Sequence, residues 1–211
     1  MAHDHSHHEP YVGMTTDISR YRRILWWSLA INAAMFLIEV VASYQSGSVA
    51  LMADAIDFAG DAANYGVSLA VLTAGAGLRT RTALLKAFCM AGFGIFVLGR
   101  AIWSWQQGGV PDAPLMGSIA TLALVANLGV AWMLYAFREG DANMRSVWLC
   151  SRNDAISNIA VMVAALGVFG SHNAWPDLLV ACGMAALALT SAYAVLTHSL
   201  AELRQQAHQA Q

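Results

Sequence analysis

Long apolar runs recur along almost the whole chain after residue 23, and they limit what the chain can fold into. Crossing the roughly 30 Å hydrocarbon core of a bilayer takes about 20 helical residues, and six runs reach that length. Only 11% of the residues are charged, about half of what a soluble domain carries. The sequence therefore predicts an all-α membrane protein, with spans at residues 24–43, 49–74, 87–105, 115–137, 147–170 and 175–198.

Short segments rich in glycine and polar residues separate these runs, as expected for the connections between helices. They are SGS at 46–48, GAG at 75–77, QQGGVPDAP at 106–114, EGDAN at 139–143 and GSHNAWPD at 170–177. None of these connections is long enough to fold as a soluble domain. We therefore expect a single bundle of six transmembrane helices.

The basic residues predict the orientation of the bundle, because Lys and Arg that flank membrane spans are retained on the cytoplasmic side. The loops at 44–48, 106–114 and 171–174 contain neither residue. Both termini are therefore expected in the cytoplasm, with tails at 1–19 and 200–211 on either side of a transmembrane domain at 20–199. The basic residues that set this orientation are Arg20, Arg22, Arg23, Arg79, Arg81, Lys86, Arg138, Arg145 and Arg204.

The first ten residues, MAHDHSHHEP, lack the basic start and apolar core of a cleaved secretion signal, so the first span is expected to be permanent. A histidine-rich composition attracts Zn²⁺ and similar ions weakly. The segment is either a device that captures metal or an incidental polar tail. Its histidines are His3, His5, His7 and His8.

The cysteines and the basic clusters exclude two further possibilities. Cys89, Cys150 and Cys182 are odd in number and all lie within expected spans, so a disulfide framework is not expected. Cys89 and Cys182 have no metal-binding partner in register and are expected to be packing residues. The basic clusters lack the interleaved aromatic residues of nucleic-acid surfaces, so no nucleic-acid partner is expected.

Three carboxylates interrupt the second apolar run, in the stretch DAIDFAGDAANYG that begins at residue 54. On a helix, Asp57 and Asp61 differ by about 40° and Asp54 lies about 60° from Asp57, so all three are expected to face one way. Ionisable residues at membrane depth face the bundle interior and handle ions or protons by default. A divalent metal would relieve their mutual repulsion. The alternative is that they hydrogen-bond neighbouring helices as packing groups, and for Asp54 an orienting, proton-carrying or packing role stays open.

The fifth run offers a matching set of side chains. In VWLCSRNDAISNIAVMVAA, Cys150 and Asp154 are one helical turn apart on the same face. Arg152 lies about 160° from Asp154 around the helix and is expected to point away. Metal sites in helix bundles draw ligands from facing helices. Asp57, Asp61, Cys150 and Asp154 are therefore the expected metal ligands, four anionic groups for tetrahedral coordination.

Two motifs resemble those of the cation diffusion facilitator family of metal transporters. They are SGSVALMADAIDFAGD in the second span and NMRSVWL before the fifth, and the resemblance covers nearly every residue after the tail. It implies a bacterial inner-membrane transporter with six helices. At Cys150 the family more commonly has His or Asp. Members usually continue into a cytoplasmic domain, so the chain is expected to be a short form whose homodimer is held by its membrane helices.

The resemblance implies export of Zn²⁺, and the thiolate of Cys150 adds Cd²⁺. Carboxylates and a thiol must lose protons to bind metal, which favours metal/proton antiport by alternating access without a prosthetic group.

Two alternatives stay open. A membrane phosphatidyl-alcohol transferase also holds metals with DxxxD carboxylates, but its DGxxAR segment does not occur here. A passive metal channel would need no proton gradient. We therefore expect a transporter rather than an enzyme.

Overall fold

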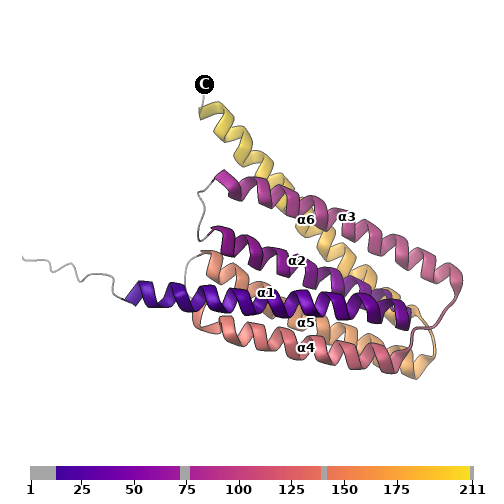
Figure 1. Cartoon of the computed structure of the whole chain (residues 1–211). Helices are drawn as coiled ribbons and strands as arrows, with labels where there is room; N and C mark the ends of the chain where they lie inside the picture. Colours follow the sequence, from indigo (N-terminus) through magenta and orange to yellow (C-terminus); the bar gives the residue numbers. More distant parts are fainter. Residues whose placement is uncertain (1–12, 72–76, 139–141, 210–211) are drawn as a thin grey trace, which may run out of the picture.

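The computed structural model describes residues 13–71, 77–138 and 142–209, and these ranges contain helices and turns but no strand. Side chains are described at 18–70, 87–138, 148–149 and 151–197. The all-α prediction is confirmed for the described ranges (Figure 1). The elements are α1 (Gly13–Ser46), α2 (Val49–Val71), α3 (Gly77–Gln107), α4 (Ala113–Leu134), the 3-10 helix η1 (Tyr135–Phe137), α5 (Ala142–Ser171) and α6 (Trp175–Gln209).

Most of these helices have the length and composition of membrane spans. Five segments within the described residues are long and apolar enough to cross a bilayer: Ile18–Ser46, Ala87–Gln107, Ala113–Phe137, Ser151–Ser171 and Trp175–Thr197. Helix α2 has 23 residues, but Asp54, Asp57 and Asp61 lower its apolar character. The structure thus agrees with a helical membrane protein, and its first and last helices extend beyond the predicted spans.

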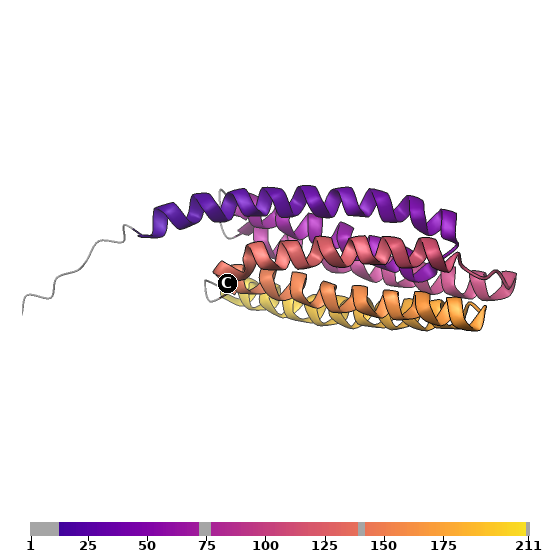
Figure 2. The same ribbon diagram turned by 90° about the horizontal axis from the view of Figure 1, so that it is seen from below.

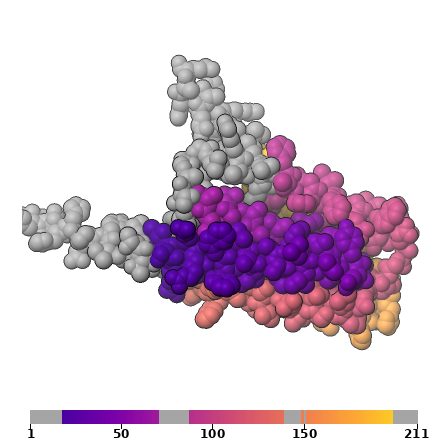
Figure 3. All heavy atoms as spheres, viewed as in Figure 1, coloured from indigo at the N-terminus to yellow at the C-terminus, as the bar shows by residue number. Residues whose placement is uncertain are grey.

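The outer surface is apolar where a soluble protein would be polar. Trp105 and Trp132 are 74% and 80% exposed, and many other large apolar side chains also face outward. Figure 3 shows α1 extending along one face of the molecule, and its exposed residues include Trp26, Trp27 and Leu37. Contiguous apolar surface of this kind is suited to lipid rather than water.

The helices run up and down along a common direction. Helix α1 begins and α6 ends at the same end of the bundle, the terminal end, whereas the α1–α2, α3–α4 and α5–α6 connections lie at the opposite end, the turn end (Figure 1). Helices α1, α2, α4 and α5 pack together as a four-helix group. Helices α3 and α6 pack on each other as a pair, which contacts α2 and α5. Figure 2 shows α1 and α6 at opposite faces.

Small side chains allow the helices to approach closely toward the turn end. A Cβ atom on Gly94 of α3 would lie 2.8 Å from Leu189 Cγ and 3.3 Å from the Ala185 carbonyl oxygen of α6, so only glycine fits there. Gly47, with φ of 72°, makes the tight turn from α1 to α2 in the left-handed region that favours glycine. The buried core of this half is rich in alanine: Ala42, Ala50, Ala53, Ala101, Ala120, Ala164, Ala165, Ala181 and Ala185.

Candidate metal centre

Three of the four predicted metal ligands line the same cavity. Asp57 and Asp61 reach it from α2 and Asp154 reaches it from α5, and the cavity measures about 420 Å³. Helices α3 and α6 form the remaining walls, with side chains that include Met90, Phe93, Met184 and Ser191. None of the described residues that line it is Lys, Arg or His. The fold thus brings together carboxylates that are more than 90 positions apart in the sequence.

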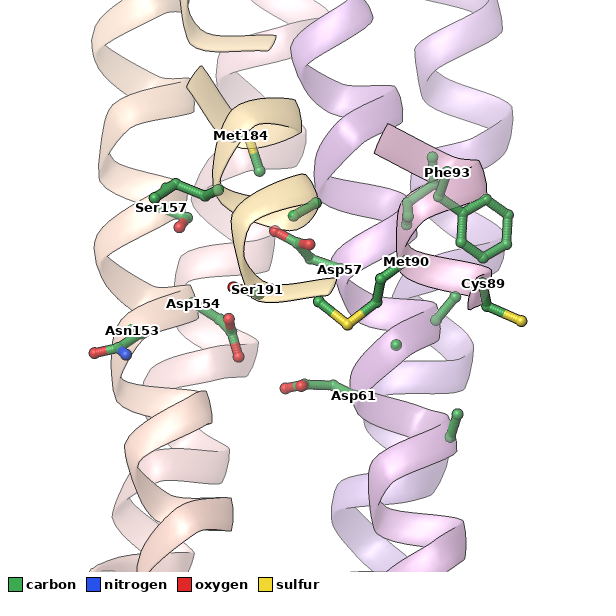
Figure 4. Close-up of a pocket in the computed structure, with 16 residues that line it drawn as sticks. Asp57, Asp61, Cys89, Met90, Phe93, Asn153, Asp154, Ser157, Met184 and Ser191 are labelled. Atoms are coloured by element: carbon green, nitrogen blue, oxygen red, sulfur yellow. The ribbon is translucent and has the colours of Figure 1, made fainter. Parts of the chain in front are cut away.

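The carboxylates are directed into the space between the helices. Figure 4 shows Asp61 and Asp154 pointing toward each other across this space, with Asp57 on the same helix as Asp61 and closer to Met184. The spacing of four residues places Asp57 and Asp61 one turn apart on one face of α2. Asp61 is buried, and Asp57 and Asp154 are half-buried. All three are shielded from bulk solvent yet border an open cavity.

Asp154 has a carboxylate oxygen without a partner. Its Oδ2 atom is buried and makes no hydrogen bond to any described residue. The nearest basic residue along α5, Arg152, is exposed, donates to Asn153 Oδ1 over 3.2 Å and lies 5.5 Å from the centre of the Trp148 ring. The prediction that Arg152 points away from the ligands is therefore confirmed. A buried carboxylate oxygen without a hydrogen-bond donor destabilises the protein unless it binds a proton or a cation.

Tyr65 supports Asp61 and connects the two helices that hold the carboxylates. Its hydroxyl donates to Asp61 Oδ2 over 3.3 Å and lies 2.6 Å from Ser151 Oγ on α5, a distance at which the serine hydroxyl can donate to it. Tyr65 and Ser151 are both fully buried. Sequence reasoning missed this pair. The available signal was the spacing of four residues between Asp57, Asp61 and Tyr65, which places all three on one face of the helix.

The fourth predicted ligand, Cys150, belongs to α5, but its side chain lies outside the described residues, as do the amino-terminal histidines. Among the side chains that are described, no three His, Cys, Asp or Glu residues lie close enough together to form a metal-binding group. The set of Asp57, Asp61, Cys150 and Asp154 therefore stays a prediction. The spacing of four residues between Cys150 and Asp154 predicts that both lie on the same face of the helix.

Asp54 differs from the other two aspartates of α2. It is 1% exposed and does not line the cavity, and its Oδ2 atom has no described hydrogen-bond partner. Glu39 is fully buried on α1, and both of its carboxylate oxygens also have no described hydrogen-bond partner. Asp54 is therefore not part of the lining of the cavity, although it lies about 60° from Asp57 around the helix. It lies closer to the turn end, where α1 and the alanine-rich core pack tightly on α2.

Two cysteines also differ from their predicted packing role. Cys89 and Cys182 are exposed rather than buried packing residues. Cys89 lines the cavity, but Figure 4 shows its thiol pointing away from Asp57 and Asp61. The neighbouring Met90 instead extends its thioether toward the two carboxylates. Helix α3 therefore presents a soft, polarizable atom to the cavity.

Comparison with known proteins points to one family. The cation efflux transmembrane domain family matches residues 25–204. The zinc transporter ZitB of Escherichia coli (strain K12) is 27% identical over 96% of this chain and 68% of its own length, and ZitB of Pectobacterium atrosepticum is 28% identical over 96% and 65%. The cadmium, cobalt and zinc/H(+)-K(+) antiporter of Bacillus subtilis is 21% identical over 85% of this chain and 62% of its own length.

The family match extends from α1 into α6 and includes the cavity with its three carboxylates. It also includes the motifs of the second and fifth helices on which the resemblance was based. The chain therefore belongs to the cation efflux family, the cation diffusion facilitators.

Proposed function

We propose that this chain exports divalent transition metals, Zn²⁺ foremost and also Cd²⁺, in exchange for protons. The observation that carries this proposal is the cavity that Asp57, Asp61 and Asp154 line from two facing helices. Three carboxylates at membrane depth, with no basic residue among the described lining, favour a cation as their partner. The names of the relatives, zinc transporters and a cadmium, cobalt and zinc antiporter, support the choice of ions.

In this proposal the transported metal binds to Asp57, Asp61, Cys150 and Asp154. Two carboxylates from α2 and a carboxylate and a thiolate from α5 complete a tetrahedral set. The thiolate makes the site partly soft, which favours Zn²⁺ and Cd²⁺ over Mn²⁺ and Mg²⁺. Tyr65 holds the carboxylate of Asp61 by its hydrogen bond and thereby limits the directions from which a metal can approach it. The metal is cargo, and the proposal includes no prosthetic group.

Proton exchange follows from the chemistry of the ligands. Carboxylic acids and a thiol must release protons before they bind a metal, so metal and protons compete for the same groups. An inward proton gradient favours protonation of the site when it faces outward, and the metal then leaves. The ligands come from two helices, whereas the alternative phosphatidyl-alcohol transferase needs one contiguous motif. This arrangement supports transport rather than enzymatic catalysis.

We propose six spans with both termini in the cytoplasm, so that the terminal end is the cytoplasmic end. Helix α2 is added to the five apolar spans and brings the number to six. It can cross the membrane because Asp57 and Asp61 face the cavity rather than lipid. Arg20, Arg22 and Arg23 near the beginning of α1 support this orientation. The transmembrane domain then corresponds to residues 20–199 and the cytoplasmic tails to 1–19 and 200–211. The bacterial relatives favour the inner membrane.

The helix packing is suited to alternating access. The alanine-rich core includes residues of α2 and α5 that lie between the carboxylates and the turn end, and in this proposal it blocks passage in that direction. Movement of the α3–α6 pair against the four-helix group would open the turn end and close the cytoplasmic side. Exposed apolar side chains on α3 and α6, among them Ile102, Trp105 and Leu179, offer a surface for a homodimer held by membrane helices.

Transport by reconstituted vesicles tests the proposal. Zn²⁺, Cd²⁺, Mn²⁺ and Fe²⁺ are offered separately, and internal pH is followed with a dye. We expect Zn²⁺ and Cd²⁺ to move with protons moving in the opposite direction. Metal movement with constant internal pH under an imposed gradient would indicate a passive channel, and no metal movement would reject transport. Asp112→Asn is a matched control, because this exposed aspartate caps α4 at the surface, away from the cavity.

A further inference from the structure

Another carboxylate is buried outside the cavity, at the turn end. Asp177 lies in the first turn of α6 and is fully buried. It accepts hydrogen bonds from Ser48 Oγ at 2.6 Å, from the Val49 amide at 2.8 Å and from the Ala50 amide at 3.1 Å. Val49 and Ala50 are the first two residues of α2. An aspartate of one helix therefore caps another helix that is 128 positions away in the sequence.

Asp177 and Ser48 together provide hydrogen-bond acceptors for the first backbone amides of α2. The first amides of a helix have no partner within the helix. Ser48 Oγ accepts from the Leu51 amide at 3.0 Å, so the amides of Val49, Ala50 and Leu51 are all paired. Asp177 also lies in the first turn of its own helix, so the positive ends of two helix dipoles stabilise one carboxylate. The distances from Asp177 to Ser48 Oγ and to the Val49 amide lie in the range of charge-assisted hydrogen bonds, whereas the bond from the Ala50 amide is longer.

The position of Asp177 connects the two groups of helices. It belongs to the α3–α6 pair, and its hydrogen-bond donors belong to the beginning of α2 in the four-helix group. Asp57 follows Val49 by two helical turns on the same continuous helix. The capped end of α2 therefore fixes where its carboxylates stand relative to the wall of the cavity that α6 forms.

We propose that Asp177 is a positioning residue for transport: it ties the beginning of α2 to α6 and stabilises the conformation that is closed at the turn end. This inference rests on the proposed function. Opening the turn end by moving the α3–α6 pair would separate Asp177 from Val49 and Ala50. A weaker tie should therefore reduce the fraction of molecules that accept metal from the cytoplasmic side, and the apparent affinity for metal falls by the same fraction.

The test compares Asp177→Asn and Ser48→Ala with the wild type and with Asp112→Asn. Asn keeps one acceptor oxygen but turns an amide donor toward the amides of α2. Zn²⁺ transport is measured with metal presented on the cytoplasmic side. We expect Asp177→Asn to raise the Zn²⁺ concentration for half-maximal transport by up to roughly tenfold, the factor that corresponds to one lost hydrogen bond to a charged group and is reached when the competent conformation becomes a minor one. The maximal rate should change much less, and Ser48→Ala should have a smaller effect in the same direction.

Amide hydrogen exchange provides a readout that does not depend on transport. Asp177→Asn should accelerate exchange in a peptide covering residues 47–52 while leaving residues 61–70 at the wild-type rate. Asp112→Asn should alter only the beginning of α4. Unchanged exchange at 47–52, or an unchanged half-saturating Zn²⁺ concentration in an active variant, would overturn the inference. If Asp177→Asn does not fold, the same two criteria apply to Ser48→Ala. A wild type that moves no metal would reject the proposed function, and the exchange experiment would still test the tie.

Discussion

Asp177 and Asp154 are both carboxylates inside the helix bundle, yet their surroundings differ completely. The carboxylate of Asp177 accepts three hydrogen bonds from the beginning of α2. Asp154 borders a cavity, and its Oδ2 atom is buried without a described hydrogen-bond partner. The turn end around Asp177 is filled by small apolar side chains, whereas the space around Asp154 is open.

The carboxylate of Asp177 connects two helices, whereas we propose that the carboxylate of Asp154 binds an ion. Hydrogen bonds from two backbone amides and one hydroxyl occupy the carboxylate oxygens of Asp177. An oxygen that lacks such donors keeps its capacity to bind a cation or a proton. The two aspartates thus differ in their hydrogen bonds and in their access to the cavity, and both properties are needed to tell them apart, because buried oxygens of Asp54 and Glu39 also lack described partners outside the cavity.

The largest effect is expected from removing a carboxylate of the cavity. Asp57→Ala, Asp61→Ala or Asp154→Ala should reduce Zn²⁺ transport at least about 100-fold, because each removes one anionic ligand. Thermal stability should be unchanged or higher, because removal also relieves repulsion between carboxylates. Asp177→Asn should instead lower the melting temperature. Vesicle transport and thermal unfolding of the purified protein measure the two quantities. A clear loss of stability in Asp154→Ala would place this residue in the same class as Asp177.

Cys150 should control which metal is carried. Cys150→Ala should weaken Zn²⁺ and Cd²⁺ binding by more than about tenfold, because one of four ligands is lost. Cys150→Asp should weaken Cd²⁺ most and admit Mn²⁺ or Fe²⁺, because an all-oxygen site suits harder ions. Cys150→His should retain Zn²⁺ at some cost to Cd²⁺. Competition between metals in transport and in equilibrium binding measures these changes.

Two cysteines of the chain provide controls for this series. Cys182→Ala alters an exposed thiol that does not line the cavity. Cys89→Ala alters one that lines the cavity but points away from Asp57 and Asp61. Both variants should keep the wild-type order of metal affinities. If Cys150→Ala also keeps the wild-type affinities, Cys150 is a packing residue, and the fourth ligand must be water or another side chain.

A smaller effect is expected from the hydroxyl that connects α2 to α5. Tyr65→Phe removes the hydrogen bonds to Asp61 and Ser151 while preserving the buried ring. Zn²⁺ affinity should fall by about tenfold, the lower end of the range for residues that orient metal ligands. Tyr193→Phe, at an exposed position, is the control. Zn²⁺ binding by both variants is measured calorimetrically. Equal affinities in the two variants would show that Asp61 needs no support from Tyr65.

The smallest effect is expected from the amino-terminal histidines. Deleting residues 1–10 removes a segment whose composition binds metal only weakly. The maximal transport rate should stay within about twofold of the wild type, and at most the required metal concentration should rise. Initial rates over a range of Zn²⁺ concentrations measure both quantities. Complete loss of transport would assign the tail to the transport mechanism itself.

The sequence was most informative where a property depends on neighbouring positions along the chain. Apolar runs of membrane length predicted a helical membrane protein, and the described ranges confirm its all-α character. Helical spacing of four residues predicted that Asp57 and Asp61 face one cavity together with Asp154, and the structure places all three there. Periodicity also predicted that Arg152 points away, because residues two positions apart lie on opposite sides of a helix.

Only the tertiary structure decided how the helices use these residues. Asp54 is close in register to Asp57 and Asp61, but tight packing near the turn end excludes it from the cavity. Tyr65 meets Ser151 across 86 positions, and Asp177 meets Val49 across 128. Helical periodicity is a local property of the chain, so the sequence determined the face on which each side chain lies. Which helix lies opposite that face depends on packing between distant segments, and that packing leaves Asp177 hydrogen-bonded to the beginning of α2 and Asp154 beside a cavity.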